Sequence, residues 1–286
     1  MLKKIAILLE MIKFKLTVFA MPFAFMGAFL AARGLPDFRT ILLVILAMVG
    51  ARTCAMGFNR IVDARFDAAN PRTAERAIPA GAVSMTEAWS MVIIAGFLFF
   101  FAAWALNPLT LKLAPFALGL TLFYSLTKRF TSFCHLILGV ALAFSPLGGW
   151  VAVQGSLVSF PWALSLGVLF WVAGFDTVYG CLDADFDEKA GLHSLPSRLG
   201  PRNAFRLAAG FHVAALCLFA YAGVQAHLNY FYFVGVALAA AALFYQHWIV
   251  NPNDLSRIQV SFFSMNGFIS VALFIATWIA LLTENL

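Results

Sequence analysis

Charged residues are scarce in this 286-residue chain. Asp, Glu, Lys and Arg together make up 11% of it, against about 25% in a typical soluble domain. This scarcity excludes a soluble globular enzyme, a disordered chain and a nucleic-acid-binding protein. The four cysteines show no C-x-x-C spacing and the five histidines no H-E-x-x-H, so neither a disulfide framework nor a zinc site is predicted. P-loop and G-x-S-x-G motifs are also absent, which leaves nucleotide hydrolysis and a nucleophile elbow without support.

The chain is instead rich in apolar residues. They amount to 63% of the sequence, or about 180 side chains, and one bilayer crossing takes about 20 residues. The sequence therefore predicts an all-α, polytopic membrane protein that forms a single domain over residues 1–286. Apolar runs separated by turn-forming residues define nine expected spans, at about 16–32, 38–58, 86–106, 108–126, 133–153, 160–182, 203–223, 229–250 and 262–283.

Basic residues are distributed unequally between the two faces that nine alternating spans create. Sixteen of the nineteen Lys and Arg fall on the face shared by the N-terminus, and only Arg33, Arg39 and Lys112 fall on the other. The positive-inside rule assigns the basic face to the cytoplasm. We therefore expect an inner (cell) membrane protein whose long charged loops, at 59–85 and 183–202, are cytoplasmic and carry the active site.

The first of these loops begins with an acidic motif at the end of a span. Asn59, Asp63 and Asp67 are spaced i, i+4, i+8, which predicts three oxygen donors on one helical face. Oxygen donors in such a row would repel one another unless a cation lay among them. Carboxylates at a membrane edge are costly and therefore indicate function.

A second acidic motif stands at the end of another span. Asp176, Asp183 and Asp187 are separated by seven and four residues, which again predicts a single helical stripe. Asp185 and Glu188 lie alongside. Eight of the thirteen acidic residues of the chain fall in the two segments, so the two motifs are best interpreted together.

The types of side chain indicate what these motifs bind. Carboxylates and an asparagine amide suit a hard cation such as Mg²⁺, which is usually held by one or two carboxylates and by phosphate oxygens of a substrate. Basic residues that suit a diphosphate accompany the acids. They are Arg72, Arg76, Lys128, Arg129, Lys189 and Arg198. The two sets together predict a metal–diphosphate site.

Three segments of the chain resemble a known family. Residues 59–81, NRIVDARFDAANPRTAERAIPAG, are similar to the first signature of the UbiA-type intramembrane aromatic prenyltransferases, N-x-x-x-D-x-x-x-D followed by R-T-x-x-R. Residues 176–194, DTVYGCLDADFDEKAGLHS, resemble the second signature, and residues 124–131, YSLTKRFT, resemble the short loop between them. With the expected spans, the likeness covers nearly the whole chain.

This resemblance implies a bundle of about nine transmembrane helices around a central cavity. It also implies Mg²⁺-dependent transfer of a polyprenyl group from its diphosphate to an aromatic acceptor. Asn59, Asp63 and Asp67 would bind one Mg²⁺, and Asp183 with Asp187 would bind the other. The four aspartates of this set are the expected catalytic residues.

The resemblance also implies where the two substrates bind. Arg129 would hold the carboxylate of the acceptor, and Asp176 would orient the acceptor. No residue stands out as the general base. The diphosphate would be contacted by Arg72, Tyr124, Lys128 and Lys189.

The acceptor is left open between two classes. 4-Hydroxybenzoate, in ubiquinone-type quinone biosynthesis, is the first expectation. The stretch 57–81 is also similar to enzymes that prenylate a carboxylated naphthoquinol in menaquinone biosynthesis. The expected partners are a polyprenyl diphosphate, a small aromatic acid and the lipid bilayer, with no nucleic acid and no obligate protein partner.

Two other classes of membrane protein carry spaced acids. A secondary transporter would place its ion-coupling acids near the bilayer midplane, whereas these acids cluster at one membrane edge beside bases. A CDP-alcohol phosphotransferase would carry a D-G-x-x-A-R core, which this sequence lacks. Both classes are therefore weaker hypotheses than a prenyltransferase.

Overall fold

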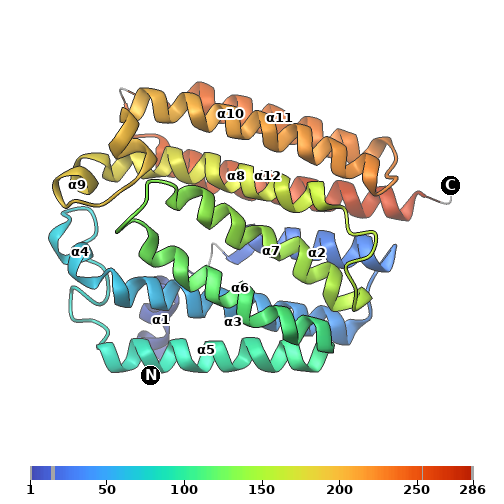
Figure 1. Cartoon of the computed structure of the whole chain (residues 1–286), viewed down its shortest axis with the longest axis horizontal. Coiled ribbons are helices and arrows are strands. Elements are labelled where there is room, and N and C mark those ends of the chain that lie inside the picture. The colour runs from blue at the N-terminus through green and yellow to red at the C-terminus, as the bar shows by residue number, and fades with distance from the viewer. Residues whose placement is uncertain (1, 14–16, 253, 285–286) are drawn as a thin grey trace.

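The computed structural model describes residues 2–13, 17–252 and 254–284, and the regular secondary structure of these residues is entirely helical. Within these ranges, long helices lie side by side along the molecule, and two short helices, α4 (Ala64–Ala69) and α9 (Ala184–Lys189), lie at one end of it (Figure 1). The long helices are α2 (Thr17–Ala32), α3 (Phe38–Val62), α5 (Met85–Leu106), α6 (Pro108–Thr127), α7 (Cys134–Gln154), α8 (Trp162–Gly180), α10 (Leu195–Gln225), α11 (Tyr230–Ile249) and α12 (Ile258–Leu282). The short elements are α1 (Leu2–Met11), α4 (Ala64–Ala69), the 3₁₀ turn Cys181–Asp183 and α9 (Ala184–Lys189).

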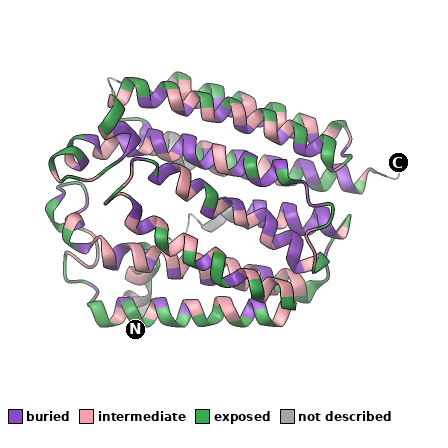
Figure 2. Ribbon diagram, viewed as in Figure 1, coloured by how far each residue is buried: buried purple, intermediate pink, exposed green. Residues whose placement is uncertain are grey.

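Each long helix corresponds to one expected span. Among the described residues, eight helices are long and apolar enough to cross a membrane, and α2 contributes a shorter apolar stretch, Met21–Ala32. Residue 16, the expected start of the first span, lies outside the described residues. Large apolar side chains such as Phe97, Phe116 and Phe244 are exposed, as lipid-facing residues would be. Figure 2 shows many exposed residues along the outer helices α5 and α10. The prediction of an all-α polytopic membrane protein is confirmed.

One segment expected to be a loop is partly helical. α10 begins at Leu195 rather than near residue 203, because Ser194 caps it by accepting a hydrogen bond from the Ser197 N–H at 3.2 Å. The helix is interrupted at Gly200, whose φ of 73° and ψ of 157° suit only glycine. The expected loop at 183–202 therefore contains α9 and the first turns of α10.

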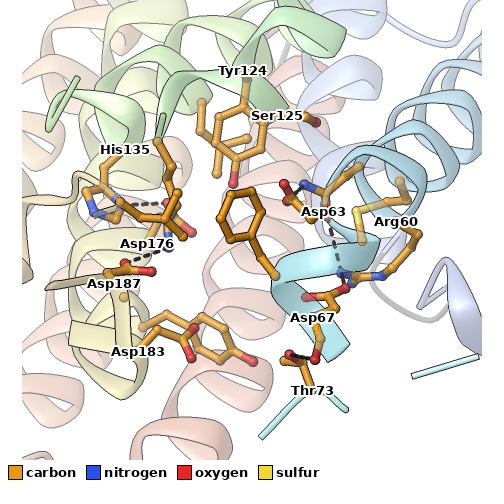
Figure 3. A pocket seen from close by; sticks show the side chains of 18 of the residues that line it. Arg60, Asp63, Asp67, Thr73, Tyr124, Ser125, His135, Asp176, Asp183 and Asp187 are labelled. Atoms are coloured by element: carbon orange, nitrogen blue, oxygen red, sulfur yellow. Dashed lines mark hydrogen bonds and ion pairs between the residues drawn. The ribbon is translucent and has the colours of Figure 1, made fainter. Parts of the chain in front are cut away.

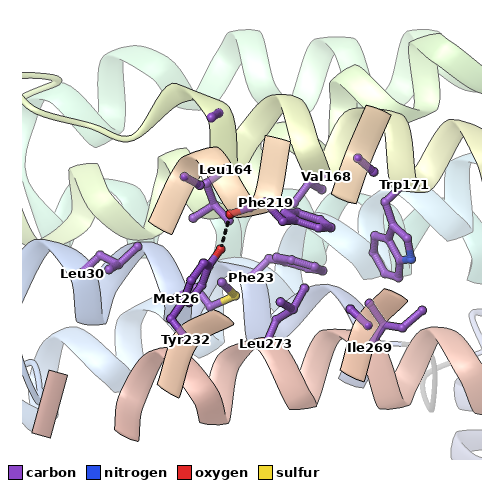
Figure 4. Close-up of a cluster of buried hydrophobic side chains, with 14 of the residues drawn as sticks. Phe23, Met26, Leu30, Leu164, Val168, Trp171, Phe219, Tyr232, Ile269 and Leu273 are labelled. Carbon is purple, nitrogen blue, oxygen red and sulfur yellow. Dashed lines mark hydrogen bonds between the residues drawn. The ribbon is translucent and has the colours of Figure 1, made fainter. Parts of the chain in front are cut away.

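The two largest of four apolar clusters among the described residues join most of the helices. The first joins α2, α8 and α10 through Phe23, Trp171 and Phe219, with the Phe23 and Trp171 ring centroids 5.1 Å apart (Figure 4). Tyr232 of α11 lies in this core and donates its hydroxyl to the Phe219 carbonyl at 2.8 Å, which satisfies its buried polar atom. The second core joins α1, α3, α5 and α6. The site described below is lined by helices of both groups.

Helices α2 and α7 approach closely because each has a glycine against the backbone of the other. A Cβ on Gly149 would lie 1.9 Å from the Ala24 carbonyl oxygen, and a Cβ on Gly27 would lie 1.9 Å from the Pro146 carbonyl oxygen. Small residues permit such contact between transmembrane helices. The contact fixes α7, which carries part of the site, against α2.

Substituting Gly149→Ala is expected to destabilise the bundle by about 1–3 kcal/mol, because backbone atoms cannot move aside for the added methyl group. Gly148→Ala is the matched control, since a Cβ at Gly148 meets nothing within 4 Å. Thermal unfolding in detergent measures both effects. Equal midpoints for the two variants would contradict the close contact.

Candidate active site

Both acidic segments come to the same end of the bundle, where α4 and α9 lie (Figure 1). Each segment is bent at its middle aspartate. α3 ends at Val62, and Asp63 has φ −94° and ψ 1°; the second segment passes through a 3₁₀ turn to Asp183, with φ −112° and ψ 3°. The helix is therefore interrupted within each motif, but the predicted common face is kept: Asn59 Nδ2 donates to Asp63 Oδ2 at 2.9 Å, and the residues of both motifs line one cavity.

The bends have a physical consequence for the last acid of each motif. In a straight helix, eight residues extend over about 12 Å, so Asp67 and Asp187 would be carried beyond the end of the bundle. The bends fold α4 and α9 across that end instead. Asp67 and Asp187 are consequently buried, at 6% and 2% exposure, and face the cavity (Figure 3).

The two motifs line a single cavity of about 290 Å³. Residues of α3, α6, α7 and α8 complete its wall. The structure brings together here nearly every site residue expected from the sequence. The aspartates among them are Asp63, Asp67, Asp176, Asp183 and Asp187 (Figure 3). The others are Asn59, Arg72, Tyr124, Lys128 and Arg129.

Lys189 lies elsewhere. It is exposed at the end of α9 and is not among the residues that line the cavity. It follows the buried Asp187 by two positions, about half a helical turn, so the two side chains lie on opposite sides of the helix. Its predicted contact with a diphosphate stays a prediction. Arg198 also lies outside the cavity, in an exposed hollow beside α9.

The first motif reaches across to the second. Arg72 donates its Nε to Asp183 Oδ1 at 2.8 Å and forms an ion pair with Asp183 Oδ2 through Nη2. Asn70 donates its Nδ2 to the same Oδ1 at 3.0 Å. Within the first motif, Arg76 Nη1 lies 2.6 Å from Asp67 Oδ1. These contacts join the two acidic segments into one site.

The connection between α6 and α7 supplies two further bases. Lys128 Nζ lies 2.9 Å from Asp187 Oδ2. Arg129 Nη2 lies 3.0 Å from Asp63 Oδ1 and donates to the Val62 carbonyl at 2.7 Å. Both motifs are thus tied to this connection, and four of the five cavity carboxylates have a basic partner.

Burial sets the charge balance of this cluster. It raises the pKa of Asp63 to about 6, against the opposing effect of Arg129. Burial alone would lower the pKa of Lys128, but the neighbouring Asp187 outweighs it and raises that pKa. The cavity therefore holds dense charge of both signs in a place where Coulomb interactions are stronger than in water.

A second cavity, of about 200 Å³, lies deeper among α2, α3, α5, α6 and α7. Its wall is mostly Ala, Leu, Met and Phe side chains. The two cavities share Arg52, Asn59 and Tyr124 as lining residues, so the polar cavity adjoins the apolar one. A molecule with an anionic head and an apolar tail fits this arrangement.

Comparison with known proteins identifies the arrangement. The model of the UbiA prenyltransferase family matches residues 20–282. The chain belongs to this family. Membership confirms the resemblance carried by the two signatures, and it confirms that this UbiA-family protein is an integral membrane prenyltransferase.

Curated relatives and solved structures of UbiA proteins agree with this assignment. The 4-hydroxybenzoate octaprenyltransferase of Shewanella woodyi is 30% identical over 251 residues, 88% of this chain and 87% of that protein. Its namesake from Alkalilimnicola ehrlichii is 31% identical over 226 residues, 78% and 76% of the two chains. The apo structure of a UbiA homologue from Aeropyrum pernix K1 is 35% identical in sequence and has a TM-score of 0.83. The match covers 95% of this chain and 98% of that one. A UbiA homologue from Archaeoglobus fulgidus bound to GPP and Mg²⁺ shares the fold, with a TM-score of 0.69 and 20% identity. The match covers 93% of this chain and 99% of that one.

Two residues in the wall of this UbiA-family site were not expected from the sequence. Arg52 of α3 lines both cavities, and its Nε is buried with no hydrogen-bond partner among the described residues. An isolated arginine within an apolar span is the signal that could have found it. His135 of α7 lies 2.7 Å from Asp176, 41 positions along the chain. No sequence pattern links those two.

Proposed function

We propose that this protein transfers a polyprenyl group from its diphosphate to the ring of a carboxylated aromatic acceptor, with 4-hydroxybenzoate as the expected acceptor. The observation that carries the proposal is the polar cavity of paired acids and bases that adjoins an apolar cavity. The names of the curated relatives support the choice of acceptor. The homologue bound to GPP and Mg²⁺ supports the choice of donor and ion.

The donor set fits Mg²⁺. Asp67 Oδ2 is buried, has no hydrogen-bond partner among the described residues and lies 3.9 Å from Arg60 Nη1, so it offers a ligand atom that no hydrogen bond occupies. No three His, Cys, Asp or Glu side chains of the described residues are grouped so as to hold an ion by themselves. This suits Mg²⁺, because water and substrate phosphates usually complete its shell. Asn59, Asp63 and Asp67 would hold one ion, and Asp183 with Asp187 the other.

The bases of the site bind and orient the diphosphate. Bound Mg²⁺ would supply further positive charge against the negative charge that builds on the leaving diphosphate. Arg72 and Lys128 now pair with Asp183 and Asp187, and they become available to the diphosphate when those carboxylates take up cations. Fixed bases in a poorly hydrated cavity stabilise such a leaving group more than free bases in water do. Tyr124 lies where the head group would meet the tail.

The apolar cavity protects the reactive part of the donor. When the allylic C–O bond breaks, its electron pair leaves with the diphosphate and a carbocation remains. This cation must meet the aromatic ring before it meets water. The Ala, Leu, Met and Phe side chains that line the deeper cavity exclude water around the prenyl group.

Two arginines are candidates for the acceptor carboxylate. Arg129, the residue expected from the family resemblance, is already paired with Asp63 at 3.0 Å. Arg52 lies between the two cavities with its Nε unpartnered. A buried N–H of a guanidinium without a partner is costly, and a substrate carboxylate would remove that cost. Asp63 would release Arg129 on binding a cation, as Asp183 and Asp187 would release Arg72 and Lys128. We nevertheless propose Arg52 for the acceptor carboxylate, because its Nε has no partner to give up.

Arg52→Gln and Arg129→Gln distinguish these two positions. Loss of a hydrogen bond to a charged group costs about 1.5–3 kcal/mol, so kcat/KM for a carboxylated acceptor is expected to fall about 10- to 100-fold in Arg52→Gln. The loss on the decarboxylated phenol should be much smaller. If only Arg129→Gln discriminates between the two acceptors, the carboxylate binds at Arg129 instead.

Reconstituted vesicles test the reaction itself. Purified protein would receive a polyprenyl diphosphate, Mg²⁺ and either 4-hydroxybenzoate or a carboxylated naphthoquinol, and mass spectrometry would detect the product. We expect prenylated 4-hydroxybenzoate. Product from the naphthoquinol alone would assign the menaquinone-type acceptor. No product from either would contradict the proposal.

The proposed location is the inner membrane, with the polar cavity on the cytoplasmic side. The distribution of Lys and Arg along the sequence supports this orientation. An exposed residue of α9, such as Glu188, offers a labelling position. A cysteine introduced there should react with a membrane-impermeant reagent only after the cells are opened.

A further inference from the structure

His135 and Asp176 form a pair in the wall of the polar cavity to which the proposed function gives no chemical role. His135 lies in the first turn of α7 and Asp176 in the last turns of α8, and His135 Nδ1 lies 2.7 Å from Asp176 Oδ2. The His135 side chain is 1% exposed and that of Asp176 is 18% exposed. Asp176 lies between the imidazole and the open centre of the cavity (Figure 3). The histidine therefore backs the carboxylate rather than facing a substrate.

Asp176 differs from the other cavity aspartates in its partner. The other four each form an ion pair with an arginine or a lysine, whereas the partner of Asp176 is an imidazole. A fixed positive charge beside a carboxylate favours its ionised form and makes it a weaker proton acceptor. In the four ion pairs that charge is fixed beside the carboxylate, whereas the described residues place no arginine or lysine against Asp176.

The environment of the imidazole determines which of its nitrogens contacts Asp176 as a donor. Nε2 of His135 is buried and has no hydrogen-bond partner among the described residues. A proton on Nε2 would be a buried donor without an acceptor, which is costly. The favoured tautomer therefore carries its proton on Nδ1, where it is donated to Asp176. In that state the hydrogen bond fixes one carboxylate oxygen of Asp176 and leaves the other without a contact to the imidazole.

We propose that Asp176 is the base that accepts the ring proton of the acceptor, and that His135 is the positioning residue that holds it. This inference rests on the proposed function. After the allylic C–O bond has broken, a π electron pair of the ring forms the new C–C bond. The pair of the ring C–H bond then returns to the ring, and the proton passes to the Asp176 oxygen that does not contact His135. Trp171 and Phe175 line the same wall, and their apolar rings exclude water from it. The base that takes the proton is therefore a protein group rather than bulk water.

Asp176→Asn tests the catalytic part of this proposal. Loss of a general base slows a reaction about 10²- to 10⁴-fold, so a fall of at least that order in kcat is expected. The decisive measurement uses an acceptor deuterated at the ring carbon that is alkylated. In the unmodified protein, proton loss follows a slower C–O cleavage, and deuteration should leave the rate unchanged. In Asp176→Asn, proton loss becomes limiting and a clear normal isotope effect should appear.

His135 variants test the positioning part. His135→Asn keeps an amide donor near the position of Nδ1, whereas His135→Leu removes it. We expect His135→Asn to retain most activity, and His135→Leu to lose activity and to show the isotope effect. Ser165→Ala is the matched control, because Ser165 also joins α8 to α7, by donating to the Ala143 carbonyl at 2.7 Å, but lies outside both cavities.

The outcomes separate this inference from the proposed function. If the unmodified protein prenylates no acceptor, the proposed function itself fails. If it does, and Asp176→Asn either keeps its rate or slows without an isotope effect, Asp176 is not the base. Thermal unfolding and binding of prenyl diphosphate are measured on every variant. Only a variant that unfolds and binds like the unmodified protein is compared, and Ala, which also lacks a carboxylate, is a second replacement for Asp176 if Asn does not fold.

Discussion

Asp183→Asn is expected to abolish prenyl transfer while the protein still inserts and folds. The change removes one negative charge and keeps the size of the side chain, so the hydrogen bond from Asn70 can persist in part. A metal ion supplies several kcal/mol of transition-state stabilisation, and a loss of about that size corresponds to a fall on the order of 10³-fold in kcat. The measurement is the rate of product formation at saturating polyprenyl diphosphate and acceptor.

Asp185→Asn is the matched control for this prediction. Asp185 lies two positions after Asp183, on the same short segment, but it is exposed and does not line the cavity. The same charge is removed at nearly the same place in the chain. Asp185→Asn should keep a rate close to that of the unmodified protein. Equal losses in the two variants would mean that the charge of the segment matters and that a specific ligand position does not.

Removal of divalent cations should have an effect as large as Asp183→Asn. Protein washed with chelator is expected to lose turnover, and added Mg²⁺ is expected to restore it. The reason lies in the ion pairs: without cations, the basic residues remain engaged by the carboxylates and cannot all turn to a diphosphate. Full turnover in chelator would contradict the proposed role of the aspartates.

Thermal stability provides a second readout that does not depend on turnover. A ligand at about 100 times its dissociation constant stabilises a folded protein by about 2.7 kcal/mol. Mg²⁺ together with prenyl diphosphate should therefore raise the unfolding midpoint clearly, and prenyl diphosphate in chelator should not. Asp183→Asn should lose this rise and Asp185→Asn should keep it. A rise that persists in Asp183→Asn would place the cations elsewhere.

The spans were predictable from the sequence because a bilayer leaves few structural choices. A backbone in lipid must satisfy its own hydrogen bonds, so an apolar run of sufficient length becomes a helix. The helices α3, α5 and α6 accordingly begin or end within a few residues of the predicted bounds. The error at α10 arose where the chain leaves the apolar region, because Ser194 and Gly200 act through local geometry.

The side chains that meet in the site were only partly predictable. The spacing of the acids indicated that they bind a cation, and the family signatures indicated which basic residues share the site with them. The bends at Asp63 and Asp183 were not predictable, because the i, i+4 spacing is equally compatible with a straight helix. Lys189 directly follows the second motif in the sequence, yet it lies on the exposed side of α9.

The amino-acid sequence by itself determined the class of protein, the helices, the two acidic segments and the family, because composition and spacing along one chain carry that information. Only the tertiary structure decided which groups touch: Arg72 with Asp183, Lys128 with Asp187, and His135 with Asp176. The physical reason is that these pairs are made by residues far apart in the chain. Their meeting depends on how α3, α6, α7 and α8 pack, and packing is a property of the whole bundle.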